Sequence, residues 1–370
     1  MKPSLAIASR EGKIVPSSDF QLSFLSKIQR IFNEGEFAAT YKFALILGIA
    51  DLCIDKTADC NESVFISFQE LGGKFIAYYW QQSQPFARTG GEEQVLLQNH
   101  GRQAAIVSSI RVFREKYPRE TINTAQHNRA FSGLLASVIR TIKEQPVKYI
   151  QNLAGGRDPF IFEEHKDGLL LRDGVAFCLR RFHPLVTQMA RAQWVNHIRG
   201  IALNTRILGP SDDLESFLFS ASRQALGLLR EGLMDLRSKC FYCDGSLVRG
   251  GDVDHFIPFS LYPRDMVPNF VLAHASCNRS KSNKLASGEH LERWLDFSEQ
   301  HRVDLAQISQ IAGIRFEERG SLSVALWAHQ NASSAGDVAW QEKQNFVQVL
   351  ERDINLIQGR ISSLSKASYP

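Results

Sequence analysis

The chain of 370 residues is short of cysteine, of net charge and of long apolar runs. Six cysteines are too few for a disulfide-rich secreted scaffold. The longest apolar run, FALILGIA at residues 43–50, is far too short to span a bilayer. The N-terminal MKPSLAIASREGK has no sustained apolar core and does not resemble a signal peptide. We therefore expect a cytoplasmic protein without a membrane partner, with buried free thiols at Cys53, Cys60 and Cys178.

The sequence also lacks the motifs of ATP-driven enzymes and of common sequence-specific DNA-binding domains. The chain has no GxxxxGK[ST] motif, so any energy-coupled partner would be a separate chain. No helix-turn-helix pattern or fixed-period repeat that could read a DNA sequence stands out. The net charge of +4 is only mildly basic, but residues 101–150 carry nine Lys and Arg against three Glu, and residues 237–284 carry seven against four Asp. Such clusters indicate either phosphate contacts or a solvated basic face, and the sequence leaves both open.

Two pairs of metal-ligating residues enclose the most informative stretch. Cys240 and Cys243 have the Cys-x2-Cys spacing, and His274 and Cys277 have the same spacing after thirty intervening residues. Two turns that each present a pair of soft nitrogen or sulfur ligands are typical of a closed, tetrahedral structural zinc site. The sequence therefore predicts Zn²⁺ bound by these four side chains.

A second set of polar residues lies inside the loop that this zinc would close. Asp254 and His255 come first, Asn269 follows fourteen residues after the histidine, and Asn278 follows nine residues later beside Cys277. The Cys-x2-Cys pair, the block DVDHFIP, the Asn before VLAHASC and the block CNRSK together resemble the HNH endonucleases with the ββα-metal (His-Me finger) fold. DVDH and NRSKSN are also similar to the HNH domain of RNA-guided CRISPR nucleases.

The resemblance implies a fold and a division of roles. One strand would end at Asp254 and His255, a second would span 270–272, and a helix would begin near residue 275. His255 would be the general base, Asp254 and Asn278 would hold a divalent cation, and Asn269 would orient the base. The implied reaction is phosphodiester hydrolysis that leaves a 5′-phosphate and a 3′-hydroxyl, in which the cation acts as a Lewis acid and a neutral histidine takes a proton from water.

The stretch departs from the family pattern at two positions. His274 stands where many zinc-bearing relatives have a cysteine, and Asn278 stands where the family name expects a histidine. Imidazole binds zinc well, and an amide oxygen is a hard ligand, so we expect Mg²⁺ or Mn²⁺ at the catalytic site rather than Zn²⁺ or Ni²⁺. Arg279 and Lys281 would lie on the same short helix and are expected to hold flanking phosphates of the nucleic acid.

The predicted fold class is mainly α with a small α+β part. We expect four regions: a helical N-terminal region at 1–158, a short β meander with long helices at 159–236, the zinc-pinned HNH domain at 237–286, and a helical C-terminal region at 287–370. Residues 63–82 indicate a helix or a strand followed by a helix. The aromatic residues in this segment are predicted to be core rather than a base-stacking surface: Phe75, Tyr78, Tyr79 and Trp80.

Further expectations concern individual elements. Asp-Gly turns between the apolar runs of 159–178 predict an antiparallel meander. One helix is predicted from about residue 210 to 236, with Asp212 and Glu215 at capping-box spacing. A last helix, roughly 338–364, carries a heptad pattern that is compatible with a homodimer, although docking within the chain is favoured. His183 and His197 are expected to be structural.

The leading hypothesis is a metal-dependent HNH endonuclease that nicks or cuts DNA, with RNA left open as a substrate. Its biological setting is predicted to be phage defence or restriction, with protein partners of a defence system. The alternatives are a homing or mobile-element nuclease, and a zinc-knuckle nucleic-acid-binding subunit that is active only within a larger complex.

Overall fold

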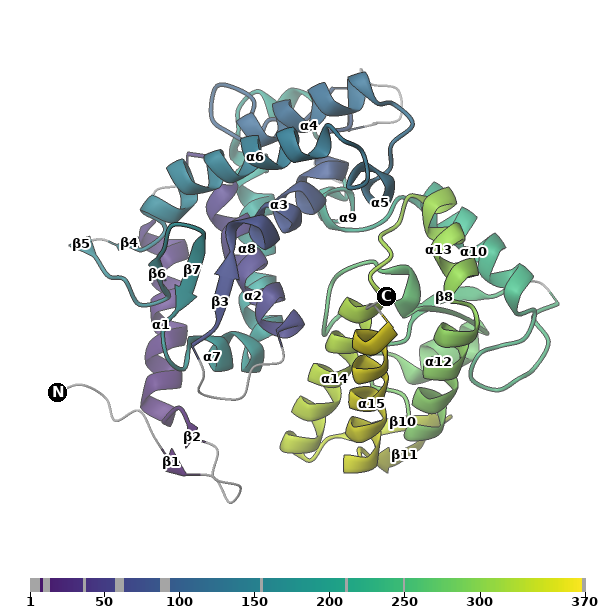
Figure 1. Ribbon diagram of the computed structural model, residues 1–370. Helices are drawn as coiled ribbons and strands as arrows, with labels where there is room; N and C mark the ends of the chain where they lie inside the picture. The colour runs from purple at the N-terminus through teal and green to yellow at the C-terminus, as the bar shows by residue number, and fades with distance from the viewer. Residues whose placement is uncertain are drawn as a thin grey trace. The chain divides into compact units, whose positions relative to one another are not determined.

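The structure, a computed structural model, describes residues 7–8, 14–35, 38–56, 63–86, 94–153, 156–209, 212–248 and 250–367. The chain divides into two compact units (Figure 1). Unit 1 comprises Met1–Glu120 and His127–Leu218, and unit 2 comprises Thr121–Gln126 and Phe219–Pro370. Helices dominate and the sheets are small and antiparallel, so the predicted fold class is confirmed. Among the residues that the structure describes, every helix is too short or too polar to cross a membrane.

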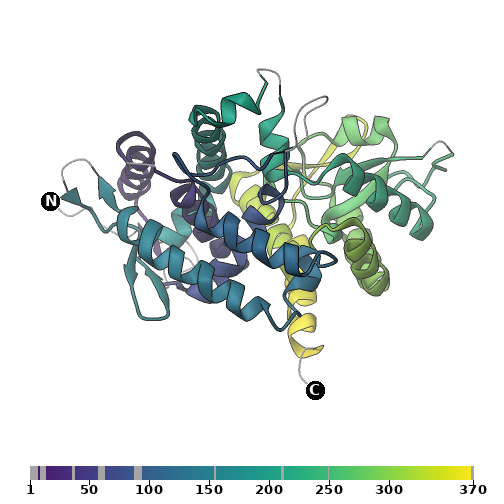
Figure 2. The ribbon, with the colours of Figure 1, turned by 90° about the horizontal axis from the view of Figure 1, so that it is seen from above.

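Unit 1 is built around the apolar helix α2 (Tyr41–Asp55), which is buried on nearly all sides. The helices α3, α7 and α8 pack against it, while α4 and α6 lie side by side (Figures 1 and 2). The predicted core aromatics Phe75, Tyr78, Tyr79 and Trp80 are all buried, which confirms that prediction. The other helices of unit 1 are α1 (Ser18–Glu34), α3 (Phe68–Gln82), α4 (Ala105–Lys116), α6 (Phe131–Ile142), the π-helical η1 (Lys143–Val147), α7 (Val175–Arg181), α8 (His183–Gly200), the 3₁₀ turn η2 (Asn204–Arg206) and α9 (Leu214–Phe219).

The predicted meander is only partly right. The strands β6 (Phe162–Glu164) and β7 (Gly168–Leu171) form a hairpin, but the third strand of the sheet is β3 (Phe65–Ser67), in the order β3-β7-β6. The third apolar run begins the helix α7 instead, directly after Gly174, whose φ of 76° is left-handed. The strand β3 continues into α3 through a capping box of Ser67 and Glu70, as the strand-and-helix alternative predicted. Short two-stranded pairs are formed by β1 (Ile7–Ala8) with β2 (Ile14–Val15), and by β4 (Asn152–Leu153) with β5 (Gly156–Arg157).

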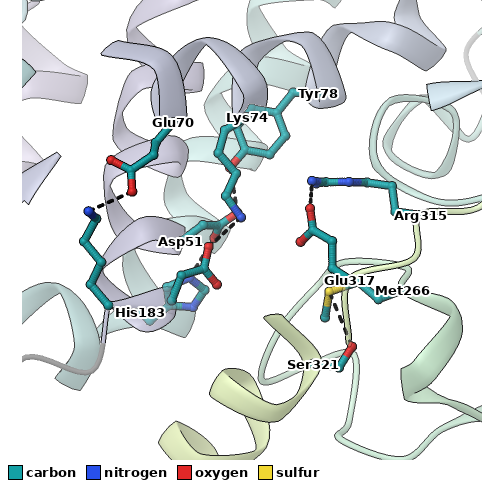
Figure 3. A network of polar contacts seen from close by, with 11 residues as sticks. Asp51, Glu70, Lys74, Tyr78, His183, Met266, Arg315, Glu317 and Ser321 are labelled. Carbon is teal, nitrogen blue, oxygen red and sulfur yellow. Dashed lines mark hydrogen bonds and ion pairs between the residues drawn. The ribbon is translucent and has the colours of Figure 1, made fainter. Parts of the chain in front are cut away.

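A buried polar network crosses the core of unit 1 (Figure 3). The carboxylate of Asp51 accepts hydrogen bonds from the Tyr78 hydroxyl at 2.6 Å and from Nε2 of His183 at 2.9 Å. His183 is fully buried, so it serves the core, as predicted. His197 is half-buried, and burial together with the nearby His100 lowers the pKa of His197 to about 4. The predicted thiols of Cys53 and Cys178 are free and buried, while Cys60 lies outside the described residues.

Unit 2 holds the predicted zinc knuckles and a two-stranded hairpin. The strands β8 (Asp252–His255) and β9 (Phe270–Ala273) pair antiparallel, with His255 opposite Phe270. The ring of Phe256 stacks on Trp294, with centroids 4.8 Å apart, and Trp294 donates to the carbonyl of Pro268. The remaining elements are α5 (Ile122–Ala125), α10 (Arg223–Leu236), η3 (Val267–Asn269), α11 (Ala275–Lys281), α12 (Gly288–Gln300), α13 (Arg302–Ala312), α14 (Glu318–Ala335), β10 (Val338–Glu342), β11 (Asn345–Gln348) and α15 (Glu351–Ala367).

Two long helices predicted from sequence are interrupted. The segment predicted as one helix from 210 to 236 is two helices, α9 and α10, because Ser222 caps α10 by accepting the backbone N–H of Ala225. The cap of α9 is Asp213 rather than Asp212, since it accepts the backbone N–H of Ser216. Serine and aspartate at these positions favour a new helix start over continuation.

The predicted last helix is also shorter than expected. Residues 338–348 form the hairpin of β10 and β11, and only α15 is helical. Two turn residues after β10 reverse the chain, with Lys343 at a φ of 47°. The helix α15 packs on α12 and α14 of its own unit, and Ile357 is fully buried there (Figure 1). The heptad pattern is therefore used for docking within the chain.

Candidate functional site

The four predicted zinc ligands come together in unit 2. Cys240 and Cys243 lie on the turn that follows α10, whereas His274 and Cys277 lie at the start of α11. Their ligand atoms are all within 4.8 Å of one another, and Cys243 Sγ is 3.3 Å from His274 Nδ1. Zinc bonds of about 2.0–2.3 Å place the donors of a tetrahedron about 3.3–3.8 Å apart. The cluster therefore fits a structural Zn²⁺ site.

The His274 ring is already oriented for metal binding. Its Nε2 lies 3.1 Å from the carbonyl oxygen of Ser246, so Nε2 carries the proton and donates it there. This hydrogen bond leaves Nδ1 with a free lone pair beside the cysteine sulfurs. Ligating histidines commonly fix their tautomer in this way.

The thiols of the cluster differ in acidity. Burial raises the pKa of Cys240, but backbone N–H groups of Cys243, His274 and Tyr242 outweigh it, so the pKa of this thiol lies below its usual value. Burial and the neighbouring thiols raise the pKa of Cys277 to about 12. Three sulfurs packed this closely can all be thiolates only when a cation shares their charge, which is what bound zinc supplies.

We predict that Cys240→Ser removes the zinc and destabilises unit 2. Because the knuckle has little core of its own, the loss should be about 3 kcal/mol or more, which lowers Tm by roughly 6–12 °C. Zinc content by mass spectrometry and thermal unfolding measure both effects. Val248→Ser, at an exposed position of the same segment, is the matched control and should keep both values. Full zinc content and unchanged Tm in Cys240→Ser would remove Cys240 from the ligand set.

Asp254 lies at the end of β8 and is nearly buried. Its Oδ2 accepts a hydrogen bond from the Tyr242 hydroxyl at 2.6 Å and lies 3.1 Å from the Lys281 ammonium. Lys281 Nζ also donates to the carbonyl of His255 at 2.9 Å, so it joins α11 to the end of β8. Asn278 precedes Lys281 by one helical turn and therefore shares its face of α11. Its side chain is half-buried.

The prediction that Lys281 contacts a flanking phosphate is wrong. Its side chain is fully buried, and burial lowers its pKa although Asp254 counteracts this. A buried carboxylate needs a partner, since an unpaired buried charge costs several kcal/mol. Lys281 is that partner. Arg279, by contrast, is exposed on the same helix, and its phosphate contact stays a prediction.

The structure also changes the partner expected for His255. Its Nε2 lies 2.7 Å from Oδ1 of Asp265, and its ring packs against Phe270 at a centroid distance of 4.4 Å. Asn269 does not orient the ring. The Asn269 amide bonds instead to both backbone groups of Ile257, accepting at 2.8 Å and donating at 3.0 Å. It thereby fixes the backbone two residues beyond the histidine.

Sequence reasoning missed two residues of this site, Tyr242 and Asp265. Tyr242 lies between the zinc-binding cysteines, and burial together with Asp254 raises its pKa well above the usual value. Asp265 lies in the loop between β8 and β9, and no fixed spacing to His255 marks it. The available signals were weak: an acidic residue in that loop, and a tyrosine inside a metal-binding turn.

Comparisons with protein families agree with the site. Residues 241–287 match the model of an HNH endonuclease, and they contain the hairpin and the helix α11 described above. Residues 21–217, just over half of the chain, match the model of a domain of unknown function (DUF8808). A comparison with curated proteins finds no match. The chain therefore belongs to the family of the domain of unknown function DUF8808 and carries an HNH endonuclease domain after it.

Proposed function

We propose that the protein is a metal-dependent HNH endonuclease that hydrolyses phosphodiester bonds of DNA, leaving a 5′-phosphate and a 3′-hydroxyl. The proposal depends on the arrangement at the end of β8. His255 is paired there with the carboxylate of Asp265. Its neighbour Asp254 forms an ion pair with Lys281 of α11, the helix that also carries Asn278. The HNH match at residues 241–287 supports nuclease activity.

His255 is the proposed general base. A carboxylate can only accept hydrogen bonds, so Nε2 of His255 carries the ring proton and donates a hydrogen bond to Asp265. The lone pair of Nδ1 is then free to take a proton from an attacking water. Side chains paired in this way keep one tautomer, which preserves the base between turnovers.

Asp254 and Asn278 are the proposed ligands of the catalytic cation. Carboxylate and amide oxygens are hard donors and suit Mg²⁺ or Mn²⁺ better than a soft metal. When bound, the cation would neutralise charge on the phosphoryl and leaving oxygens. Tyr242 and Lys281 hold Oδ2 of Asp254 in place, which fixes the direction of the carboxylate.

The direct test is cleavage of supercoiled plasmid by the purified chain. Nicked or linear DNA with 5′-phosphate ends should form with Mg²⁺ or Mn²⁺, and none should form with excess chelator. Labelled RNA of the same sequence serves as the competing substrate. Binding without cleavage under all metal conditions would instead favour a subunit that is active only within a larger complex.

The basic segment 101–150 is the proposed contact for the DNA backbone. Arg114 donates to the carbonyl of Trp80 and Lys143 donates to that of Lys166, so these two are engaged within unit 1. The seven others in this segment are exposed: Arg102, Arg111, Lys116, Arg119, Arg129, Arg140 and Lys148. Phosphate contacts by such side chains would give sequence-independent affinity that falls with salt.

We expect the fourfold variant R111Q/R129Q/R140Q/K148Q to bind DNA more weakly at every sequence tested. If all four side chains contact phosphates, the slope of log K against log [salt] should fall in magnitude by about 3 to 4. Fluorescence anisotropy across a salt series measures this. Arg352→Gln, at an exposed position of α15, is the control and should leave the slope unchanged. An unchanged slope in the fourfold variant would show that this segment is a solvated basic face that does not contact DNA.

We propose a role in restriction or phage defence, in the cytoplasm and with protein partners of the same system. The similarity of DVDH and NRSKSN to the HNH domain of RNA-guided nucleases supports this setting. Phage plating on a bacterium that expresses the parent or an inactive variant tests it. Equal plating on both strains would favour a homing or mobile-element nuclease.

A further inference from the structure

Asp265 connects the proposed base to another part of unit 2. One carboxylate oxygen, Oδ1, lies 2.7 Å from His255 Nε2, and the other, Oδ2, accepts the backbone N–H of Ala221 at 2.5 Å. Its side chain is only 10% exposed, so water competes little for either contact. Both oxygens of one carboxylate are thus committed to two groups that lie far apart in sequence.

The backbone beside Asp265 is held firmly. Met266 forms an isolated parallel bridge with Arg315, and the N–H of Val267 donates to the carbonyl of Arg315 at 2.8 Å. The sulfur of Met266 contacts the Ser321 hydroxyl at 3.8 Å (Figure 3). The connection from α13 to α14 therefore fixes the backbone position of Asp265. A carboxylate held in this way can select one orientation of an imidazole.

Ala221 lies in the short connection from α9 to α10, at residues 220–222. In sequence, this connection follows the last residue of unit 1, Leu218, and leads into the helix that ends just before the first zinc ligand. The amide of Ala221 can donate to Asp265 only while this connection keeps its present backbone conformation. The contact therefore links the conformation of the connection to the carboxylate beside the base.

We propose that Asp265 is a positioning residue that holds His255 with Nδ1 free, and that the Ala221 amide in the connection 220–222 holds Asp265 in turn. This inference rests on the proposed nuclease function. In this arrangement the connection permits catalysis when Ala221 donates to Asp265. A change in the backbone conformation of residues 220–222 releases the Asp265 carboxylate. The His255 ring is then free to rotate or to change tautomer.

Asp265→Asn is the sharpest test, because it keeps the shape of the side chain. The Ala221 N–H still needs an acceptor, so the amide oxygen faces Ala221 and the amide NH₂ faces His255. The NH₂ group then requires Nε2 of His255 to accept, which puts the proton on Nδ1 and blocks the base. A wrong tautomer of this kind lowered kcat about 10⁴-fold in a serine protease, so we expect kcat to fall roughly 10²- to 10⁴-fold here. KM for DNA should change little.

Two controls separate positioning from general damage. Asp304→Asn changes a second Asp–His pair of unit 2, in which His301 Nδ1 lies 3.2 Å from Asp304, and should keep parental kcat. Nitrogen NMR of ¹⁵N-histidine protein, assigned with His255→Ala, reads the tautomer directly. The parent should show Nε2–H at His255, and Asp265→Asn should show Nδ1–H with zinc content unchanged. A parental tautomer in Asp265→Asn, or kcat within threefold of the parent, overturns the proposal.

Ala221→Pro tests the connection, because proline has no N–H to donate. We expect kcat to fall at least tenfold and His255 to show a mixture of tautomers. Parental values for both, in a variant with normal zinc content, would overturn the role of the connection. The tautomer measurement needs no cleavage, so a parent that cuts no DNA would refute the proposed function while NMR still decides whether Asp265 positions His255.

Discussion

His255→Ala is expected to abolish metal-dependent DNA cleavage while the protein stays folded and loaded with zinc. A positioned general base is worth about 10²- to 10⁴-fold in rate, so any residual activity should fall by at least that factor. The His255 side chain is 22% exposed and packs on Phe270 and Phe259, so its truncation removes some ring contacts, and zinc content and Tm are measured beside the rate to show that the variant stays folded. Single-turnover cleavage of a plasmid with Mg²⁺ measures the effect.

The chain offers a matched control for this substitution. His301 is also partly exposed and also pairs with an aspartate, Asp304, but it lies at the junction of α12 and α13. His301→Ala should therefore cleave DNA at the parental rate. If His255→Ala cleaves as fast as the parent, the general base has been assigned to the wrong residue.

The sequence predicted the local parts of the site better than its long-range parts. The strand β8, the strand β9 and the start of α11 lie where the family resemblance places them, because β8 and β9 pair with each other and α11 follows β9 almost directly. The two ligand pairs also meet as their spacing requires. The roles of Lys281 and Asn269 were mistaken because burial and backbone partners depend on packing, which spacing does not encode.

The same distinction holds for the fold. The strand β3 pairs with β7, about a hundred residues further along the chain, so no local pattern could place it in the sheet. The break between α9 and α10 depends on one serine cap within an otherwise helical apolar stripe. That break creates the connection whose Ala221 amide reaches Asp265. A prediction of one continuous helix from 210 to 236 leaves out this connection, and with it the contact that identifies Asp265.

Lys281→Met is expected to destabilise unit 2 strongly and to make its stability depend on a divalent cation. The substitution keeps the length and apolar stem of the side chain but removes the ammonium that neutralises the nearly buried Asp254. Removing one partner of a buried ion pair costs about 3–5 kcal/mol, since the other charge is left uncompensated. For a unit of this size, Tm should fall by roughly 6–20 °C.

A cation held by Asp254 and Asn278 would supply the missing positive charge. Added Mg²⁺ should therefore raise the Tm of Lys281→Met more than that of the parent. Lys284→Met, three residues further along at an exposed position, should show neither effect. The double variant K281M/D254N removes both charges and should recover most of the lost stability, because a buried pair replaced as a whole costs much less than a broken one. Equal Mg²⁺ responses in parent and Lys281→Met would show that Asp254 is not a ligand, and the proposed catalytic metal site would then have to be abandoned.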